Sequence, residues 1–200
     1  MSIDLLRKLG VYIDTDFLTP TQCQNLCQEI QKSSFAEAKV YDADTKSSTK
    51  DDALRQSLFG TVSSQADKEI RKKIMGLRTD LEHHFNEQFD AIFEAPKYLA
   101  YDTGHFFGAH TDDQLGRRIN ISIYLNDETS QENTQNNSYC GGSLKIYGLL
   151  DNPALKDWGV SLTGAQGLLV AYRADLLHEV TPVLSGSRYA IVSRFLKPRK

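Results

Sequence analysis

Apolar residues recur along this chain with two different periods, and the change from one to the other falls near Pro96. Before Pro96 they recur every three or four residues, which predicts helices with one buried face. After it they alternate with polar residues, which predicts short strands. A helical first part followed by many short strands predicts an α+β, mostly β domain built on a barrel or sandwich.

The first part of the chain predicts two helices. Thr19-Pro20-Thr21-Gln22 has the residues of a helix start, because Thr19 can cap the helix, Pro20 suits its first position and Gln22 completes a capping box. A second helix is predicted over about 64–90. The apolar faces of the two helices comprise Cys23, Leu26, Cys27 and Ile30, and then Ile70, Ile74, Leu77, Leu81 and Phe85.

Strands are predicted on both sides of these helices. Val11-Tyr12-Ile13 predicts a short strand before them. Arg118 to Leu125 alternates cleanly, so Asn120, Ser122 and Tyr124 should share one face, opposite the isoleucines. Further strands are predicted at 143–147, 167–172, 179–183 and 189–195.

Two polar segments, 40–62 and 128–139, predict a long loop and a mobile excursion. We expect both to act as lids, since loops over a rigid scaffold usually carry specificity.

The composition is that of one ordinary globular domain spanning 1–200. The net charge is −3, so the chain lacks the overall positive charge that is typical of proteins that bind nucleic acid. No apolar run approaches the roughly 20 residues that cross a bilayer, and the N-terminus is too polar for a signal-peptide core. We therefore expect a cytoplasmic protein with no membrane partner. Cys23 and Cys27 lie on one helical stripe, so we expect them to be packed free thiols rather than a metal-binding or redox pair. The third cysteine, Cys140, has no predicted partner.

The candidate chemistry lies in the strand-rich part. His110-Thr111-Asp112 is followed by His178, and Arg188 comes ten residues after that. In an extended segment His110 and Asp112 point to the same side, while His178 must arrive from another strand. Two imidazoles and one carboxylate can hold Fe(II) and leave room for a chelating co-substrate and O2. Each motif alone is usually a surface feature, but together they predict an iron site.

The arginines that follow predict anion binding. Arg188 comes after the turn-like run Leu184-Ser185-Gly186-Ser187, so we expect a hairpin to return it beside the strand of His178. Arginine binds carboxylates through paired hydrogen bonds, so Arg188 is a candidate anchor for the distal carboxylate of 2-oxoglutarate, with Tyr124 donating to the same group.

By alternation Arg194 should face the same cavity as Arg188. A second buried cation is costly unless it is paired. We therefore hypothesise that Arg194 meets an anionic group of the substrate or of a neighbouring acid, and the alternative is a strand-end side chain that reaches solvent.

These residues resemble the Fe(II)/2-oxoglutarate-dependent dioxygenases, most closely the prolyl 4-hydroxylase-like branch, from about Val11 to Leu196. The resemblance is carried by four runs. They are Tyr101 to Asp112, Tyr124-Leu125-Asn126-Asp127, Gly141-Gly142-Ser143-Leu144, and His178 to Ala190 with its Pro182, Gly186 and Arg188.

The resemblance implies a double-stranded β-helix (jelly-roll or cupin-like) barrel over about 96–196, with supporting helices over about 19–90. It implies Fe(II) at His110, Asp112 and His178, and 2-oxoglutarate at Arg188 and Tyr124, with Tyr101 lining the pocket near the iron. It also implies O2 as co-substrate, ascorbate as an accessory reductant, and hydroxylation of an unactivated C–H with release of succinate and CO2. Related halogenases have a small residue at the carboxylate position, so Asp112 favours hydroxylation.

Two positions differ from parts of this family. Collagen-type members carry Lys where this chain has Arg188, and oxygen-sensing and bacterial members commonly carry Trp where it has Arg194. Arg194 and Asn120 are candidate substrate contacts. The resemblance points to a prolyl residue first, or a free amino acid or other small molecule, so the partner is a small-molecule, peptide or protein substrate.

Two other classes of protein share part of this pattern. The chain could be a non-catalytic barrel that senses iron, oxygen or 2-oxoglutarate and acts through a protein partner. It could instead be a zinc or manganese hydrolase or isomerase, although such an enzyme has no need for Arg188. Succinate formation separates these classes.

Overall fold

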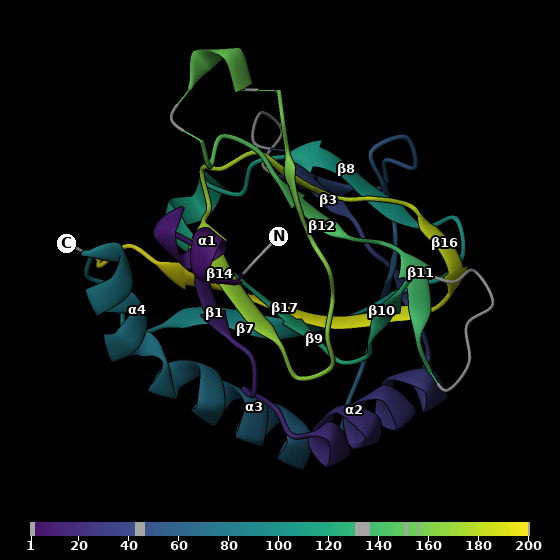
Figure 1. The fold of residues 1–200 in the computed structure, drawn as a ribbon. Helices are drawn as coiled ribbons and strands as arrows, with labels where there is room; N and C mark the ends of the chain where they lie inside the picture. Colours follow the sequence, from purple (N-terminus) through teal and green to yellow (C-terminus); the bar gives the residue numbers. More distant parts are fainter. Residues whose placement is uncertain (1–2, 43–46, 131–136, 151, 156, 200) are drawn as a thin grey trace.

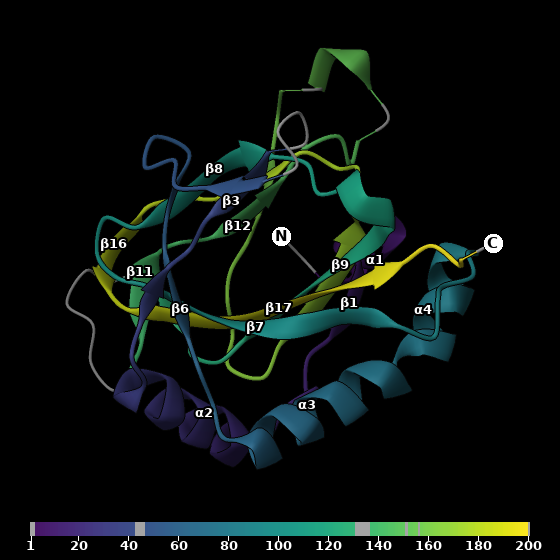
Figure 2. The same ribbon diagram turned by 180° about the vertical axis from the view of Figure 1, so that it is seen from behind.

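Two β-sheets face each other in the computed structural model, and helices cover the outside of the larger one (Figure 1). The structure describes residues 3–42, 47–130, 137–150, 152–155 and 157–199. The helices are α1 (Ile3–Lys8), α2 (Pro20–Lys32), α3 (Ser64–Gly76) and α4 (Arg78–Phe85). Seen from behind, α2, α3 and α4 run along one side of the sheet (Figure 2).

The larger sheet has seven strands in the order β1-β14-β9-β17-β7-β6-β2. These strands are β1 (Tyr12–Asp14), β14 (Leu169–Arg173), β9 (Arg117–Tyr124), β17 (Arg188–Leu196), β7 (Phe93–Tyr101), β6 (Leu58–Gly60) and β2 (Ala36–Glu37). The central strand β17 pairs antiparallel with both β7 and β9.

The smaller sheet has five strands in the order β13-β12-β15-β8-β5. They are β13 (Val160–Leu162), β12 (Leu144–Ile146), β15 (His178–Val180), β8 (Phe106–His110) and β5 (Arg55–Gln56). A three-stranded sheet joins β10 (Glu128–Thr129), β11 (Tyr139–Gly141) and β16 (Val183–Gly186), and β3 (Val40–Asp42) pairs with β4 (Ser47–Thr49). The mostly β class with supporting helices is therefore confirmed.

The predicted start of α2 is confirmed. The Thr19 hydroxyl accepts a hydrogen bond from the Gln22 backbone N–H, and the Gln22 side chain accepts one from the Thr19 N–H. The apolar face of α2 is buried, and its two cysteines are free thiols.

Alternation along the strands separates the core from the site. Ile119, Ile121 and Ile123 of β9 pack against the helices in the main core. Asn120 and Ser122, on the opposite face, line the space between the sheets. The predicted two-faced strand is thus confirmed, and it explains how one sheet supports both a helix layer and a polar pocket.

Some predicted boundaries were wrong. The helix predicted over 64–90 is two helices that are separated at Leu77. The second, α4, ends at Phe85, because the next residue, Asn86, is left-handed (φ 50°). The strand predicted over 179–183 is divided between β15 and β16. Pro182, which has no N–H for a sheet ladder, lies between them.

The two polar segments also differ from prediction. Residues 40–62 are not a loop but contain β3, β4, β5 and β6, with 43–46 outside the described residues. The segment 128–139 begins and ends in strands, its residue Tyr139 is fully buried, and 131–136 lie outside the described residues. Within the described part of the chain, no helix is both long and apolar enough to span a bilayer.

Packing between β9 and the helices should contribute strongly to stability. Ile121 is 1% exposed, whereas Ile92 is 52% exposed. We predict that Ile121→Ala lowers the free energy of unfolding by about 2–5 kcal/mol through the lost burial and the cavity left behind. Ile92→Ala, the matched control, should change it by about 0.5 kcal/mol or less. Urea denaturation measures both, and equal losses would contradict this core assignment.

Candidate metal centre

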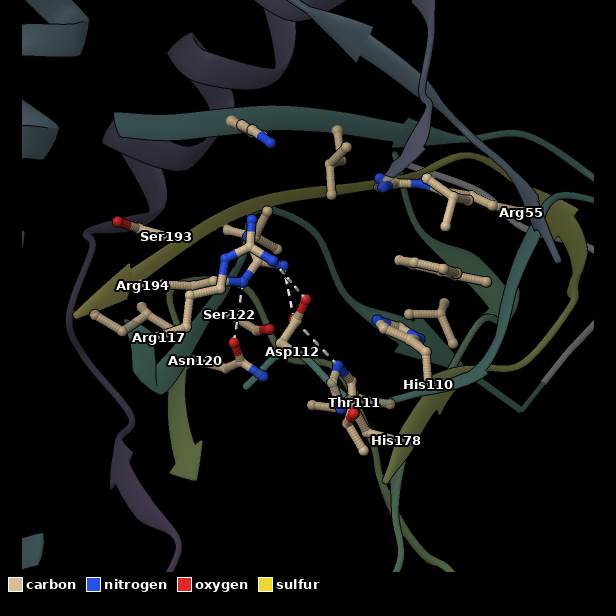
Figure 3. Close-up of a pocket in the computed structure, with 18 of the residues that line it drawn as sticks. Arg55, His110, Thr111, Asp112, Arg117, Asn120, Ser122, His178, Ser193 and Arg194 are labelled. Atoms are coloured by element: carbon tan, nitrogen blue, oxygen red, sulfur yellow. Dashed lines mark hydrogen bonds and ion pairs between the residues drawn. The ribbon is translucent and has the colours of Figure 1, made fainter. Parts of the chain in front are cut away.

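The three predicted metal ligands lie together between the two sheets. β8 ends at His110, Asp112 follows two residues later, and His178 begins the neighbouring strand β15, where it pairs with His110. The two imidazole centroids are 4.2 Å apart, and His178 Nε2 is 3.6 Å from Asp112 Oδ2. One ligand atom from each residue lies within 4.8 Å of the others (Figure 3). This spacing can close around one metal ion.

Backbone carbonyls set the tautomer of both histidines. His110 Nδ1 lies 2.8 Å from the Gly108 carbonyl, and His178 Nδ1 lies 2.9 Å from the Leu176 carbonyl. A carbonyl oxygen can only accept a hydrogen bond, so both Nδ1 atoms must donate. Each Nε2 then carries the free lone pair that a metal requires. Burial, aided by the neighbouring His178, lowers the pKa of His110 to about 4, which keeps that ligand neutral near pH 7.

Two arginines hold the Asp112 carboxylate. Arg194 donates to Asp112 Oδ2 at 2.7 Å, and Arg117 contacts Oδ1 at 3.4 Å. Glu94 links the pair from behind, at 2.6 Å from Arg117 and 3.3 Å from Arg194. Burial acts to raise the pKa of Asp112, but the charge of Arg194 holds that pKa well below the ordinary value. The carboxylate is therefore ionised and oriented.

Arg188 is a buried cation without an acidic partner in the described part of the chain. It is 2% exposed, and its guanidinium carbon lies 5.1 Å from the ring centre of Tyr101 and 5.0 Å from that of Tyr124. Its Nε and the hydroxyls of Tyr124 and Tyr139 are buried without hydrogen-bond partners. Buried polar groups are normally paired, so this cluster has the donors to receive an anion.

Gly142 makes room for that cluster. Its φ is +63°, and a Cβ there would lie 2.9 Å from Val183 Cγ2 and 3.1 Å from Arg188 Cδ. Gly142, which lies between β11 and β12, is thus required for the close approach of Arg188.

The predicted hairpin joining His178 to Arg188 is wrong. His178 lies on β15 in the smaller sheet, and Arg188 lies on β17 in the larger one. The run expected to turn is the strand β16, which pairs with β11. His178 and Arg188 therefore line one pocket from opposite sheets.

Arg194 faces the same pocket as Arg188, as predicted from alternation. It meets the neighbouring acids Asp112 and Glu94, and its Nε donates to Asn120 Oδ1 at 3.1 Å. With its side chain 12% exposed, the alternative that it reaches solvent is wrong. A contact of Arg194 or Asn120 with substrate stays a prediction.

The pocket has a volume of about 470 Å³. Tyr101, the three metal-ligand candidates and Arg188 line it, as predicted. The sequence reasoning missed Glu94, Arg117, Tyr139 and Arg55. The one sequence signal for Tyr139 is its place two residues before the Gly-Gly pair. No sequence signal linked Glu94, Arg117 or Arg55 to the site, because strand pairing in the folded protein is what brings them there.

Comparisons with known proteins agree with this geometry. The family profile of the 2OG-Fe(II) oxygenase superfamily matches residues 96–195. A PKHD-type hydroxylase of Maricaulis maris is 34% identical over 110 residues, covering 50% of this chain and 43% of that protein. A PKHD-type hydroxylase of Paracoccus denitrificans is 25% identical over 181 residues, covering 88% of this chain and 73% of that protein. The chain thus spans less than half of the first relative.

Solved structures share the fold. A prolyl-4-hydroxylase of Pseudomonas putida superposes with a TM-score of 0.68 at 20% identity, covering 98% of this chain and 97% of that one. A prolyl hydroxylase of Trichoplax adhaerens, solved with a hypoxia inducible factor peptide fragment, gives a TM-score of 0.71 at 20% identity, with coverages of 98% and 88%. The predicted double-stranded β-helix is confirmed.

The geometry predicts stoichiometric binding of a divalent metal. We expect calorimetry with Mn(II) to show one site per chain in the wild-type protein, and His178→Ala to weaken binding at least about tenfold by removing an imidazole ligand. His83→Ala, which removes an exposed histidine on α4, is the control and should leave the affinity unchanged. Equal affinities of both variants would contradict the assignment of the site.

Proposed function

The chain belongs to the 2OG-Fe(II) oxygenase superfamily, and from this premise we propose that it hydroxylates an unactivated C–H bond of its substrate at the site described above. The family uses Fe(II), 2-oxoglutarate and O2. When bound, iron would activate O2, the oxidant of this reaction: two electrons come from the substrate C–H bond and two from 2-oxoglutarate, which becomes succinate and CO2.

The donor set fits Fe(II). His110 and His178 would each offer a neutral Nε2, and Asp112 would offer an ionised oxygen, which is the two-histidine, one-carboxylate set typical of non-haem iron oxygenases. Arg117 and Arg194 would hold the carboxylate in place and share its negative charge, so their role is positioning. Asp112 supports hydroxylation over halogenation.

The observation that carries the proposal is the buried guanidinium of Arg188. Burying a charge without a partner costs several kcal/mol, and no acidic side chain in the described residues offsets it. The distal carboxylate of 2-oxoglutarate would supply that partner through two hydrogen bonds. The unpaired hydroxyls of Tyr124 and Tyr139 would donate to the same group, and Tyr101 would flank it.

For the substrate, a prolyl residue in a peptide is our first candidate. The Trichoplax neighbour was solved with a peptide, but that likeness bears on the fold alone, so the argument is one of analogy. A free amino acid or other small molecule is the alternative. The roles of Arg194 and Asn120 toward substrate, a cytoplasmic location and a single domain over 1–200 are likewise proposals.

The test is succinate formation from 2-oxoglutarate by iron-loaded protein in air. We expect turnover in the wild type, even uncoupled from substrate. Arg188→Leu should weaken 2-oxoglutarate binding at least about tenfold, because a hydrogen-bonded charge pair is lost. Arg118→Leu, the control, removes an exposed arginine of β9 that pairs with Glu87.

Absence of succinate from folded, iron-loaded protein would contradict the proposal. In that case the non-catalytic sensing barrel would be the better account. Unchanged binding in Arg188→Leu would contradict the assignment of the co-substrate anchor instead.

A further inference from the structure

We propose that Arg55 and Lys97 form a binding site for a carboxylate group of the substrate, beside the metal centre. This inference rests on the function proposed above and names the chemical class of the substrate. It is carried by an excess of positive charge in the pocket that neither the protein nor the co-substrate offsets.

The charged side chains that line the pocket are mainly cationic. Within the described residues only one acidic side chain, Asp112, lines it. The cationic side chains that line it are Lys39, Arg55, Lys97, Arg117, Arg188 and Arg194.

The charges near the metal centre already balance. Arg117 and Arg194 are paired with Asp112 and Glu94, two cations against two anions. Fe(II) and the 2-oxoglutarate dianion bring equal and opposite charges, so together they leave the excess unchanged. Arg188 takes the distal carboxylate of the co-substrate. Among the described residues Lys39, Arg55 and Lys97 therefore remain without an acid, and of these Arg55 and Lys97 share contact with one aromatic ring, that of Phe59.

Arg55 lies next to the metal ligands. Its guanidinium is 4.4 Å from the ring centre of Phe107, and that ring stacks on His110 with centroids 3.6 Å apart and planes at 17°. Arg55 donates to Ser57 Oγ at 2.7 Å, but it has no carboxylate partner among the described residues. In Figure 3 it lies across the pocket from Arg117 and Arg194. The Phe107 ring thus lies between the Arg55 guanidinium and the metal-ligand candidate His110.

Lys97, on β7 of the larger sheet, lines the same pocket and approaches one aromatic ring in common with Arg55. Its Nζ lies 5.6 Å from the ring centre of Phe59, and the guanidinium of Arg55 lies 5.3 Å from that same ring. Lys97 has no ion pair in the described structure. Lys97 remains exposed to solvent, but its partial desolvation and the charges of Arg194, Arg117 and Arg55 outweigh the carboxylate of Glu94 and lower its pKa. Two like charges at one ring repel each other unless an anion lies between them.

The ligand that fits is a carboxylate on a small unit. Arginine presents a planar fork that matches a carboxylate, and lysine adds a point charge. The pocket of about 470 Å³ also has to hold 2-oxoglutarate, so what is left suits a group of amino-acid size. The carboxylate could belong to a free amino acid or to an Asp or Glu side chain beside the target residue of a peptide.

Matched acids and amides test the proposal. The protein is loaded with Mn(II) and 2-oxoglutarate without O2, and binding is measured by calorimetry. One arm compares N-acetylproline with N-acetylprolinamide. The other compares capped peptides with Asp or Glu beside Pro against the same peptides with Asn or Gln. We expect the acid of at least one pair to bind at least about tenfold tighter than its amide. The arm in which this occurs identifies the source of the carboxylate.

Variants then locate the effect. Arg55→Gln and Lys97→Gln should each remove most of the preference for the acid, and Arg55→Lys, which keeps the charge, should restore part of it. Lys72→Gln, an exposed position on α3, is the matched control and should keep the full preference. Thermal unfolding of each variant checks that the fold is retained.

Three outcomes would overturn the inference. They are the absence of an acid preference across the panel, a preference that survives Arg55→Gln and Lys97→Gln, and an equal loss of 2-oxoglutarate affinity in these variants, which would assign the cations to the co-substrate. Failure of the proposed function is seen separately, as absence of uncoupled succinate formation by the wild-type protein.

Discussion

A guanidinium cannot be buried in a protein without something to offset its charge, and in this barrel that constraint falls on Arg188. Two tyrosine rings flank it, and Gly142 lets the backbone come close, but neither provides a negative charge. The interior is therefore built for anions that arrive from outside. The same reasoning extends to the metal centre, where Arg117 and Arg194 are balanced by Asp112 and Glu94. It extends also to Arg55 and Lys97, which have no such balance and thereby point to the substrate.

Because side chains alternate along the strands, the protein can have a charged interior and still form a large apolar core. One face of the larger sheet carries the isoleucines that pack on α2, α3 and α4, so a large apolar core lies outside the barrel. The other face is then free to carry Tyr124, Arg188 and Arg194 toward the pocket. The smaller sheet closes the opposite side and brings His110 and His178 together on paired strands. Stability and chemistry are thus supplied by opposite faces of the same strands.

Much of this site could be predicted from the sequence, because its parts obey local rules. The spacing of His110 and Asp112 on one extended segment, and the alternation of β9 and β17, follow from strand geometry alone. The predictions that failed depended on which strands pair with each other in the folded protein. Sequence proximity suggested that His178 and Arg188 share a hairpin, but it cannot show which sheet a strand joins after a turn. The strands within 40–62 are two or three residues long, so their periodicity is too short to detect. Glu94, which pairs with the arginines at the site, and Arg55, which lines the pocket, come from distant segments and carry no motif.

The affinity of the metal-loaded protein for 2-oxoglutarate, relative to 2-oxopentanoate, tests the central claim most directly. The two compounds share the 2-oxo acid group, but only 2-oxoglutarate has the distal carboxylate assigned to Arg188. With Mn(II) in the site and O2 excluded, calorimetry should show 2-oxoglutarate binding at least about tenfold more tightly, since only it pairs the buried guanidinium. Equal affinities would contradict the account, because Arg188 would then have some other partner.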